Sequence, residues 1–211
     1  MRCGALLGLT VALGLTGCVA DRQVVFPEGL EPLEENLAAW PPVGMDGLAW
    51  ATGTEGGYDW AHGRGWVDAP IDEVYAALLL PPVDVDRRKV DAWELTDEPG
   101  PYAHAYLLHN TVHDVITVEF DVSWRHGAGK GSEERPAAVA SRFQKTDGSP
   151  VISLLEGSIL ITEEGPALTS VELVEHLASL SSDTGTIQDY LGDLYADVLA
   201  TVRGEPLREY D

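Results

Sequence analysis

Residues 181–204, SSDTGTIQDYLGDLYADVLATVRG, carry the strongest helical pattern in the chain. Apolar and aromatic side chains recur there every three or four residues, which places them on one face of an α-helix: Ile187, Tyr190, Leu191, Leu194, Tyr195, Val198 and Val202. Ser182-Asp183 precedes the pattern, and Gly204 lies just past its end, as a C-terminal glycine does. The sequence therefore predicts a long terminal helix with one apolar face.

Upstream of this helix, strand-like segments alternate with turns. The strand candidates, in chain order, are residues 58–67, 90–96, 102–110, 115–124, 137–146, 151–162 and 168–180. Turn-forming residues separate the last six, among them residues 109–114, 127–136 and 147–150. The segment 115–124 alternates apolar and polar side chains, which indicates a strand with one buried face. Such short connections favour an antiparallel meander.

A short helix follows the first strand candidate. Asp68-Ala69-Pro70 has the composition of a helix start, with Asp68 as the expected N-cap and a proline early in the first turn. Helical spacing then connects four side chains: Ile71, Val74, Tyr75 and Leu78. Pro81-Pro82 ends this pattern, and a charged connection leads to the next strand.

This order of elements resembles the helix-grip fold of the START-like superfamily, which includes polyketide cyclase/dehydrase and lipid-transport domains. The residues that carry the resemblance are Gly65 to Pro70 with the helix Ile71 to Leu78, and the last strand with the helix Thr186 to Arg203. It covers about residues 58–204 and implies an α+β fold, in which a curved antiparallel sheet of about seven strands wraps around the long C-terminal helix. In this superfamily the space between sheet and helix is often a cavity for an apolar or aromatic ligand. Carriers, cyclases, hydrolases and sensors share the scaffold, so the fold does not fix an activity.

If the sheet wraps the helix, side chains from both should converge on a ligand pocket. From the sheet and helix we expect Phe120, Trp124, Phe143, Glu175, Tyr190 and Leu194, with Trp93 and Tyr106 as additions whose strand parity the pattern leaves open. Small residues on the helix, such as Gly192 and Ala196, would leave room for a cavity.

Glu175 stands out because it falls among the apolar positions of the last strand. A carboxylate on the concave face is costly unless it is paired, and it could orient a polar ligand group or act as a general acid or base with a raised pKa. Two alternatives are a bulge that turns Glu175 out and His176 in, or an ion pair of Glu175 with Arg142 or with another arginine at the end of the sheet. Glu175 and His176 are candidates for catalysis, but no residue is assigned as catalytic.

Motifs of several common enzyme classes are absent from the sequence. There is no serine nucleophile elbow, no phosphate-binding glycine loop and no paired-cysteine zinc motif, so we expect no cofactor and no metal. His109 and His113 have the spacing of a helical metal pair but fall in an expected turn without a third ligand. The remaining candidates, His62, His104 and His126, are expected at the surface or at strand ends.

The N-terminus predicts a lipid anchor. Met1-Arg2 and a short apolar run precede Leu15-Thr16-Gly17-Cys18, which resembles the bacterial lipobox. The resemblance implies cleavage before Cys18, a diacylglycerol on its thiol and acylation of the new amine, so the membrane is an expected partner through these acyl chains. Val19 rather than aspartate follows the cysteine, which by resemblance to enterobacterial sorting implies the outer membrane.

We therefore expect four segments: a lipoprotein signal peptide over residues 1–17, a lipid-anchored tether and docking arm over 18–57, the START-like domain over 58–204 and a tail over 205–211. A formal net charge of −22 makes nucleic acid a poor partner. The expected function is binding of an apolar small molecule or acyl chain at the cell envelope. The alternatives are an enzyme of polyketide cyclase/dehydrase type that uses Glu175 and His176, or a scaffold with a filled core whose protein partner is unknown.

Overall fold

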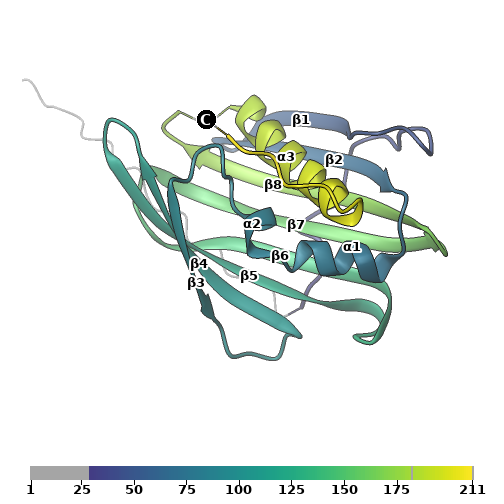
Figure 1. Cartoon of the computed structure of the whole chain (residues 1–211). Coiled ribbons are helices and arrows are strands. Elements are labelled where there is room, and N and C mark those ends of the chain that lie inside the picture. Colours follow the sequence, from purple (N-terminus) through teal and green to yellow (C-terminus); the bar gives the residue numbers. More distant parts are fainter. Residues whose placement is uncertain (1–28, 182, 211) are drawn as a thin grey trace, which may run out of the picture.

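The computed structural model describes residues 29–181 and 183–210, and they form an α+β fold with one antiparallel sheet (Figure 1). The eight strands are β1 (Ala49–Glu55), β2 (Tyr58–Val67), β3 (Ala92–Asp97), β4 (His104–His113), β5 (Thr117–Ser132), β6 (Arg135–Gly148), β7 (Ile152–Gly165) and β8 (Leu168–Ser179). Their order across the sheet is β1-β2-β8-β7-β6-β5-β4-β3. The sheet curves, and the helices α1 (Ile71–Leu78), α2 (Pro81–Asp84) and α3 (Thr184–Val202) lie on its concave side. The expected helix-grip arrangement is confirmed.

Helix α3 packs across β2 and β8, and its buried face is the one that the sequence periodicity predicts. Ile187 and Leu191 have no exposed surface, and Leu194 is 2% exposed. The helix begins with a capping box: the carboxylate of Asp183 accepts from the main-chain N–H of Thr186, and the hydroxyl of Thr186 accepts from the main-chain N–H of Asp183. Gly204 follows the helix with a φ of 69°, a conformation that glycine adopts without steric cost.

The start of α1 differs from the expectation. Pro70 occupies the N-cap position, and no side chain caps the helix, so Asp68 is not the cap. The chain enters this helix through a tight turn in which the N–H of Ala69 donates to the carbonyl of Val67. Thr169 on β8 donates its hydroxyl to the carbonyl of Ala69, which anchors the turn to the sheet.

Three strands extend through segments for which the sequence predicts turns. Strand β4 continues to His113 in regular pairing with β5, so residues 109–114 are not a turn. Strands β5 and β6 continue as a long hairpin up to Ser132 and Arg135, through most of the residues expected to form the turn 127–136. Pairing with a neighbouring strand overrides the weak local preference of these residues.

Residues 29–47 precede β1, and most of them contact the convex face of the sheet, opposite α3; near the end of the segment, Asp46 pairs with Arg203 at the end of α3. The side chain of Asn36 donates to the carbonyls of Gly63 and Leu173 at 3.0 Å, and the N–H of Leu33 donates to the hydroxyl of Ser158. The ring of Trp40 lies 4.7 Å from that of Trp66. We call residues 29–47 the arm.

Candidate functional site

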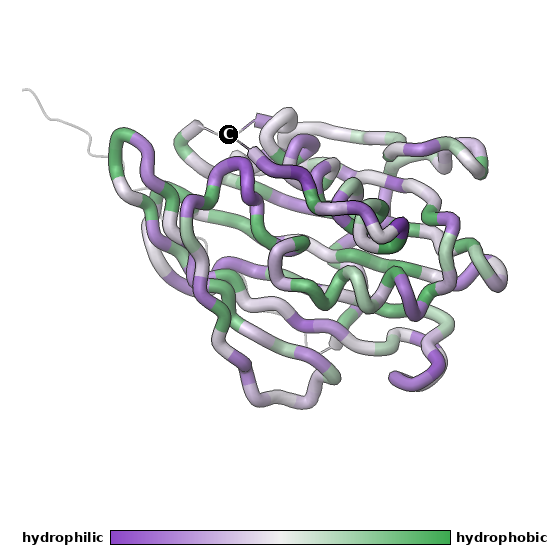
Figure 2. The backbone as a smooth tube through the Cα atoms, viewed as in Figure 1, coloured by the Kyte–Doolittle hydropathy of each residue, from purple (hydrophilic) through white to green (hydrophobic). Residues whose placement is uncertain are grey.

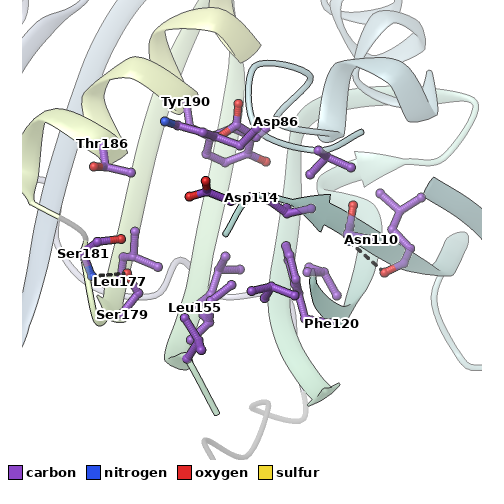
Figure 3. A pocket seen from close by; sticks show the side chains of 18 of the residues that line it. Asp86, Asn110, Asp114, Phe120, Leu155, Leu177, Ser179, Ser181, Thr186 and Tyr190 are labelled. Atoms are coloured by element: carbon purple, nitrogen blue, oxygen red, sulfur yellow. Dashed lines mark hydrogen bonds between the residues drawn. The ribbon is translucent and has the colours of Figure 1, made fainter. Parts of the chain in front are cut away.

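A cavity of about 450 Å³ lies between the concave face of the sheet and helix α3 (Figure 3). Its volume falls within the range of about 300 to 1,000 Å³ that is typical of small-molecule sites. Most of its walls are apolar, with side chains from β4 to β8: Leu108, Val112, Val118, Phe120, Val122, Trp124, Phe143, Val151, Ile152, Leu155 and Leu177.

Five of the eight residues expected in a ligand pocket line this cavity: Phe120, Trp124, Phe143, Glu175 and Tyr190. The other three, Trp93, Tyr106 and Leu194, are not among its lining residues. Leu194 is buried within the core contact between α3 and the sheet, and Tyr106 lies on the concave face beside the cavity, with its hydroxyl on Asp84. Trp93 is half-buried near the edge of the sheet, on β3.

An aromatic cluster forms one wall of the cavity. The rings of Trp124 and Phe143 stack at 4.5 Å, and the ring of Tyr190 meets Phe143 edge to face at 6.4 Å. Phe143 fits here because its pairing partner on β7 is Gly157, which has no side chain under the ring. This cluster fixes the shape of the wall by packing.

One end of the cavity is polar: four acidic or phenolic side chains gather there, next to the aromatic cluster, and Tyr190 belongs to both groups. Figure 3 shows Asp86 and Tyr190 near one another, away from Phe120, Leu155 and Leu177. Asp84 and Glu175 complete this group, which we call the acidic end. Tyr190 donates its hydroxyl to the main-chain carbonyl of Asp84 at 2.9 Å.

Both fully enclosed carboxyl groups of the acidic end have an oxygen without a hydrogen-bond partner among the described residues. These atoms are Oδ1 of Asp84 and Oε2 of Glu175, on residues that are 4% and 2% exposed. Burial, and after it the charge of Asp86, raises the pKa of Glu175 well above its ordinary value. Burial also raises the pKa of Asp84 well above its ordinary value, although the hydrogen bond from Tyr106 acts in the other direction.

A row of hydrogen bonds on the concave face, beside the cavity, leads to Asp84. The hydroxyl of Tyr106 donates to Oδ2 of Asp84, and Nε2 of His126 lies 3.1 Å from the same hydroxyl. Nδ1 of His126 lies 2.8 Å from the hydroxyl of Ser141. His126 has no exposed surface, so the expectation of a surface histidine is wrong. Burial, and after it the nearby His104, lowers the pKa of His126 to about 3, so the ring is neutral.

Glu175 and His176 point to opposite faces of β8. The pairing of β8 with β2 is regular through both residues, so the bulge that we considered is absent. Glu175 lines the cavity, whereas His176 contacts Glu34 of the arm. Arg142 also faces the arm and donates to the carbonyl of Glu31, so the alternative ion pair with Glu175 is wrong. Glu175 and His176 cannot act together on one ligand.

The convex face holds a cluster of three possible metal ligands, Glu34, His62 and His176, whose nearest ligand atoms lie within 4.8 Å of one another. The N–H of Leu37 donates to Nδ1 of His62 at 2.8 Å, so Nε2 carries the proton and donates to Oε1 of Glu34 at 2.7 Å. A protonated ring nitrogen cannot ligate a cation, and this donor set does not fit a metal. The cluster instead fastens the arm to the sheet.

The pKa shifts of His62 and His176 support this role in attaching the arm. Burial lowers the pKa of His176, but hydrogen bonds to Glu156 and Glu34 outweigh burial and raise it. Burial lowers the pKa of His62, which has no exposed surface and is not the surface residue that we expected. The raised pKa of His176 favours its charged form and the lowered pKa of His62 favours its neutral form, so His176 is the better cation for the carboxylate of Glu34.

The two histidines with metal-pair spacing lie in β4 and have separate partners. Nδ1 of His109 lies 2.7 Å from a carboxylate oxygen of Asp121, and Nδ1 of His113 lies 3.5 Å from one of Asp91. Each histidine therefore has its own carboxylate partner, and the two do not share a ligand.

The sequence reasoning did not single out Asp84 and Asp86. They lie in the charged connection after Pro81-Pro82, where no periodicity marks them. One signal was present: Asp84 stands between Val83 and Val85, both of which are buried. Apolar neighbours within a charged connection indicate that the segment touches the core.

No protein-family model matches the chain, and no curated protein matches it in sequence. Solved structures with a similar fold include human StAR-related lipid transfer protein 5, with 12% identity, 74% of this chain and 86% of that chain covered, and a TM-score of 0.49. A STAR-related lipid transfer protein from Xanthomonas axonopodis has 14% identity, 75% and 98% coverage and a TM-score of 0.46. The Zhui aromatase/cyclase from Streptomyces has 12% identity, 70% and 92% coverage and a TM-score of 0.45.

Proposed function

We propose that this protein binds an apolar small molecule or a lipid acyl chain in the cavity between the sheet and α3. The observation that carries the proposal is the cavity of about 450 Å³ with a continuous apolar wall. A well-packed core leaves few voids larger than a water molecule, so a space of this size has to be explained by an occupant. A cavity of this size is inconsistent with the alternative of a scaffold protein whose core is filled.

The rim of the cavity offers a path for such a ligand. Val115 and Ile116, in the turn between β4 and β5, are 95% and 58% exposed, and Leu180, after β8, is 74% exposed. All three also line the cavity. Figure 2 shows the turn between β4 and β5 as a hydrophobic tip at the edge of the molecule. An apolar rim lowers the cost of moving an apolar ligand through the opening.

Titration with decanol tests this function, because Trp124 lines the cavity and reports on its contents. We expect decanol to shift the tryptophan emission and to bind measurably by calorimetry. Replacing Ile152, a half-buried lining residue, with tryptophan fills part of the space and should weaken decanol binding at least tenfold. Leu95→Trp, at a residue outside the lining, is the matched control. Absence of any decanol binding to the folded protein would refute the proposal.

We further propose that the chain is held at the bacterial cell envelope, in the outer membrane, by lipids on Cys18. The lipobox-like Leu15-Thr16-Gly17-Cys18 supports this anchor, and it lies outside the described residues. Within the part of the chain that the structure describes, no helix has the length and apolar character to cross a membrane. Two or more acyl chains suffice for stable anchoring.

Replacing Cys18 with serine should abolish lipid attachment, because the thiol is the acylated group. Wild-type protein should incorporate labelled palmitate and sediment with membranes, and the variant should do neither. The variant of the other N-terminal cysteine, Cys3→Ser, is the control and should retain both properties. A wild type without label, together with a Cys18→Ser variant that still sediments with membranes, would exclude the anchor.

A further inference from the structure

We propose that the ligand carries a hydrogen-bond-donating head group, a protonated amine or a hydroxyl, which binds between Glu175 and Asp84 at the acidic end of the cavity. This inference rests on the proposed binding function and adds the chemistry of the ligand's polar end. It predicts that a fatty acid, which carries a carboxylate, binds more weakly than an amine or an alcohol with a hydrocarbon chain of the same length.

The acidic end holds two acceptor atoms to which no described residue donates. Oε2 of Glu175 and Oδ1 of Asp84 are buried without a hydrogen bond among the described residues. An unsatisfied buried polar group destabilises the folded state, and a charged one does so more strongly. Both side chains line the cavity, so a donor placed there would satisfy groups that the protein itself leaves open.

Acidic residues outnumber basic ones around the cavity. Carboxyl groups reach it from three sides: Asp84 and Asp86 from α2 and the segment after it, Asp114 from the turn between β4 and β5, and Glu175 from β8. Helix α3 contributes the phenol of Tyr190, not a cation. Lys89 is the one basic residue among the described lining, and its side chain is exposed.

This distribution discriminates between head groups. A ligand carboxylate would bring a negative charge to the end of the cavity where burial already disfavours the charged forms of Glu175 and Asp84, whereas a cation there would favour them. An ammonium group would pair with Glu175 or Asp84, and a hydroxyl could donate to either. A hydrogen bond to a charged group contributes about 1.5–3 kcal/mol, which corresponds to roughly 10- to 100-fold in affinity.

The experiment compares three ligands with one ten-carbon body, decylamine, decanol and decanoate, by calorimetric titration of the purified protein. We expect decylamine to bind at least tenfold more tightly than decanoate, with decanol between them. Comparing decylamine with decanol shows whether the site recognises the positive charge of the head group or only its ability to donate a hydrogen bond. Replacing Glu175 with glutamine should weaken the binding of decylamine at least tenfold. It should also reduce the ratio of the decylamine affinity to the decanoate affinity. Glu119→Gln, on the exposed side of β5, removes one charge outside the cavity lining and should change neither affinity.

Folding of the Glu175 variant can be verified by its stability. The pKa of Glu175 is raised in the folded protein, so its contribution to stability is full below its unfolded pKa and is lost as pH rises through the folded pKa. Glutamine does not titrate, so Glu175→Gln should unfold at the same or a higher temperature than wild type at pH 7. A folded variant with unchanged decylamine affinity would show that Glu175 does not hold the head group.

The outcomes separate the two proposals. Equal affinities for all three ligands, or the tightest binding by decanoate, would overturn the head-group inference and leave the binding function intact. Failure of all three to bind would refute the binding function and, with it, the inference. Decylamine preference that disappears in Glu175→Gln supports both.

Discussion

Replacing Leu194 with aspartate should lower the free energy of unfolding by about 3 to 5 kcal/mol. Leu194 lies in the middle of the buried face of α3 and is 2% exposed. Ile187 and Leu191, on the same face, have no exposed surface, so water does not reach the position. A carboxylate there would lose its hydration among apolar side chains and gain no compensating partner.

Urea unfolding followed by circular dichroism measures this loss. Leu180→Asp is the matched control, because it makes the same chemical change at a side chain that is 74% exposed and should alter stability by about 0.5 kcal/mol or less. If Leu194→Asp is as stable as Leu180→Asp, α3 does not close the sheet, and the cavity between them does not exist as described.

Helix α3 could be predicted because its signal is long and redundant. Its apolar side chains repeat over five turns or so, and Gly204 marks the end, so no single residue decides the assignment. Strands β2 and β8 were predicted nearly to the residue for a similar reason. Both are bounded by turn-forming residues, and in β8 the apolar residues Val171, Leu173 and Leu177 occupy alternate positions, with Glu175 among them.

Strand β1 could not be predicted in the same way. Ala49–Glu55 has few β-branched residues, lies in a proline- and glycine-rich segment, and forms an edge strand that pairs only with β2. The seven expected strands are therefore eight. The information that makes β1 a strand lies in its partner, not in its own residues.

The sequence predicts the lining residues that come from the sheet, but not those that come from the connection between α1 and β3. Strand parity places Phe120, Trp124 and Glu175 on one face because neighbouring strands share their pleat. No such periodicity exists over Pro81–Asp84, a helix of four residues, or over the segment that follows it. Asp84 and Asp86 reach the cavity through tertiary packing alone, so the acidic end becomes visible only in the folded chain.

The second large effect is expected at Gly157, which allows Phe143 to form the aromatic wall. Gly157 pairs with Phe143 on one side and with Glu175 on the other. A Cβ at this position would lie 2.1 Å from Cζ of Phe143 and 2.5 Å from the main-chain carbonyl oxygen of Val174. The ring could move, but the carbonyl belongs to the β8 ladder and could not, so relief would come at the expense of the sheet.

Gly157→Val should therefore destabilise the protein by about 3 kcal/mol and also push the ring of Phe143 toward the cavity. Decanol affinity should fall together with stability, because the displaced ring occupies ligand space. Gly165→Val, in the same strand, is the control, since a Cβ there has Leu168 at 4.0 Å as its nearest neighbour. Chemical unfolding and calorimetry of both variants measure the two effects. If Gly157→Val matches Gly165→Val in both, the contact between Gly157 and Phe143 does not shape the cavity wall.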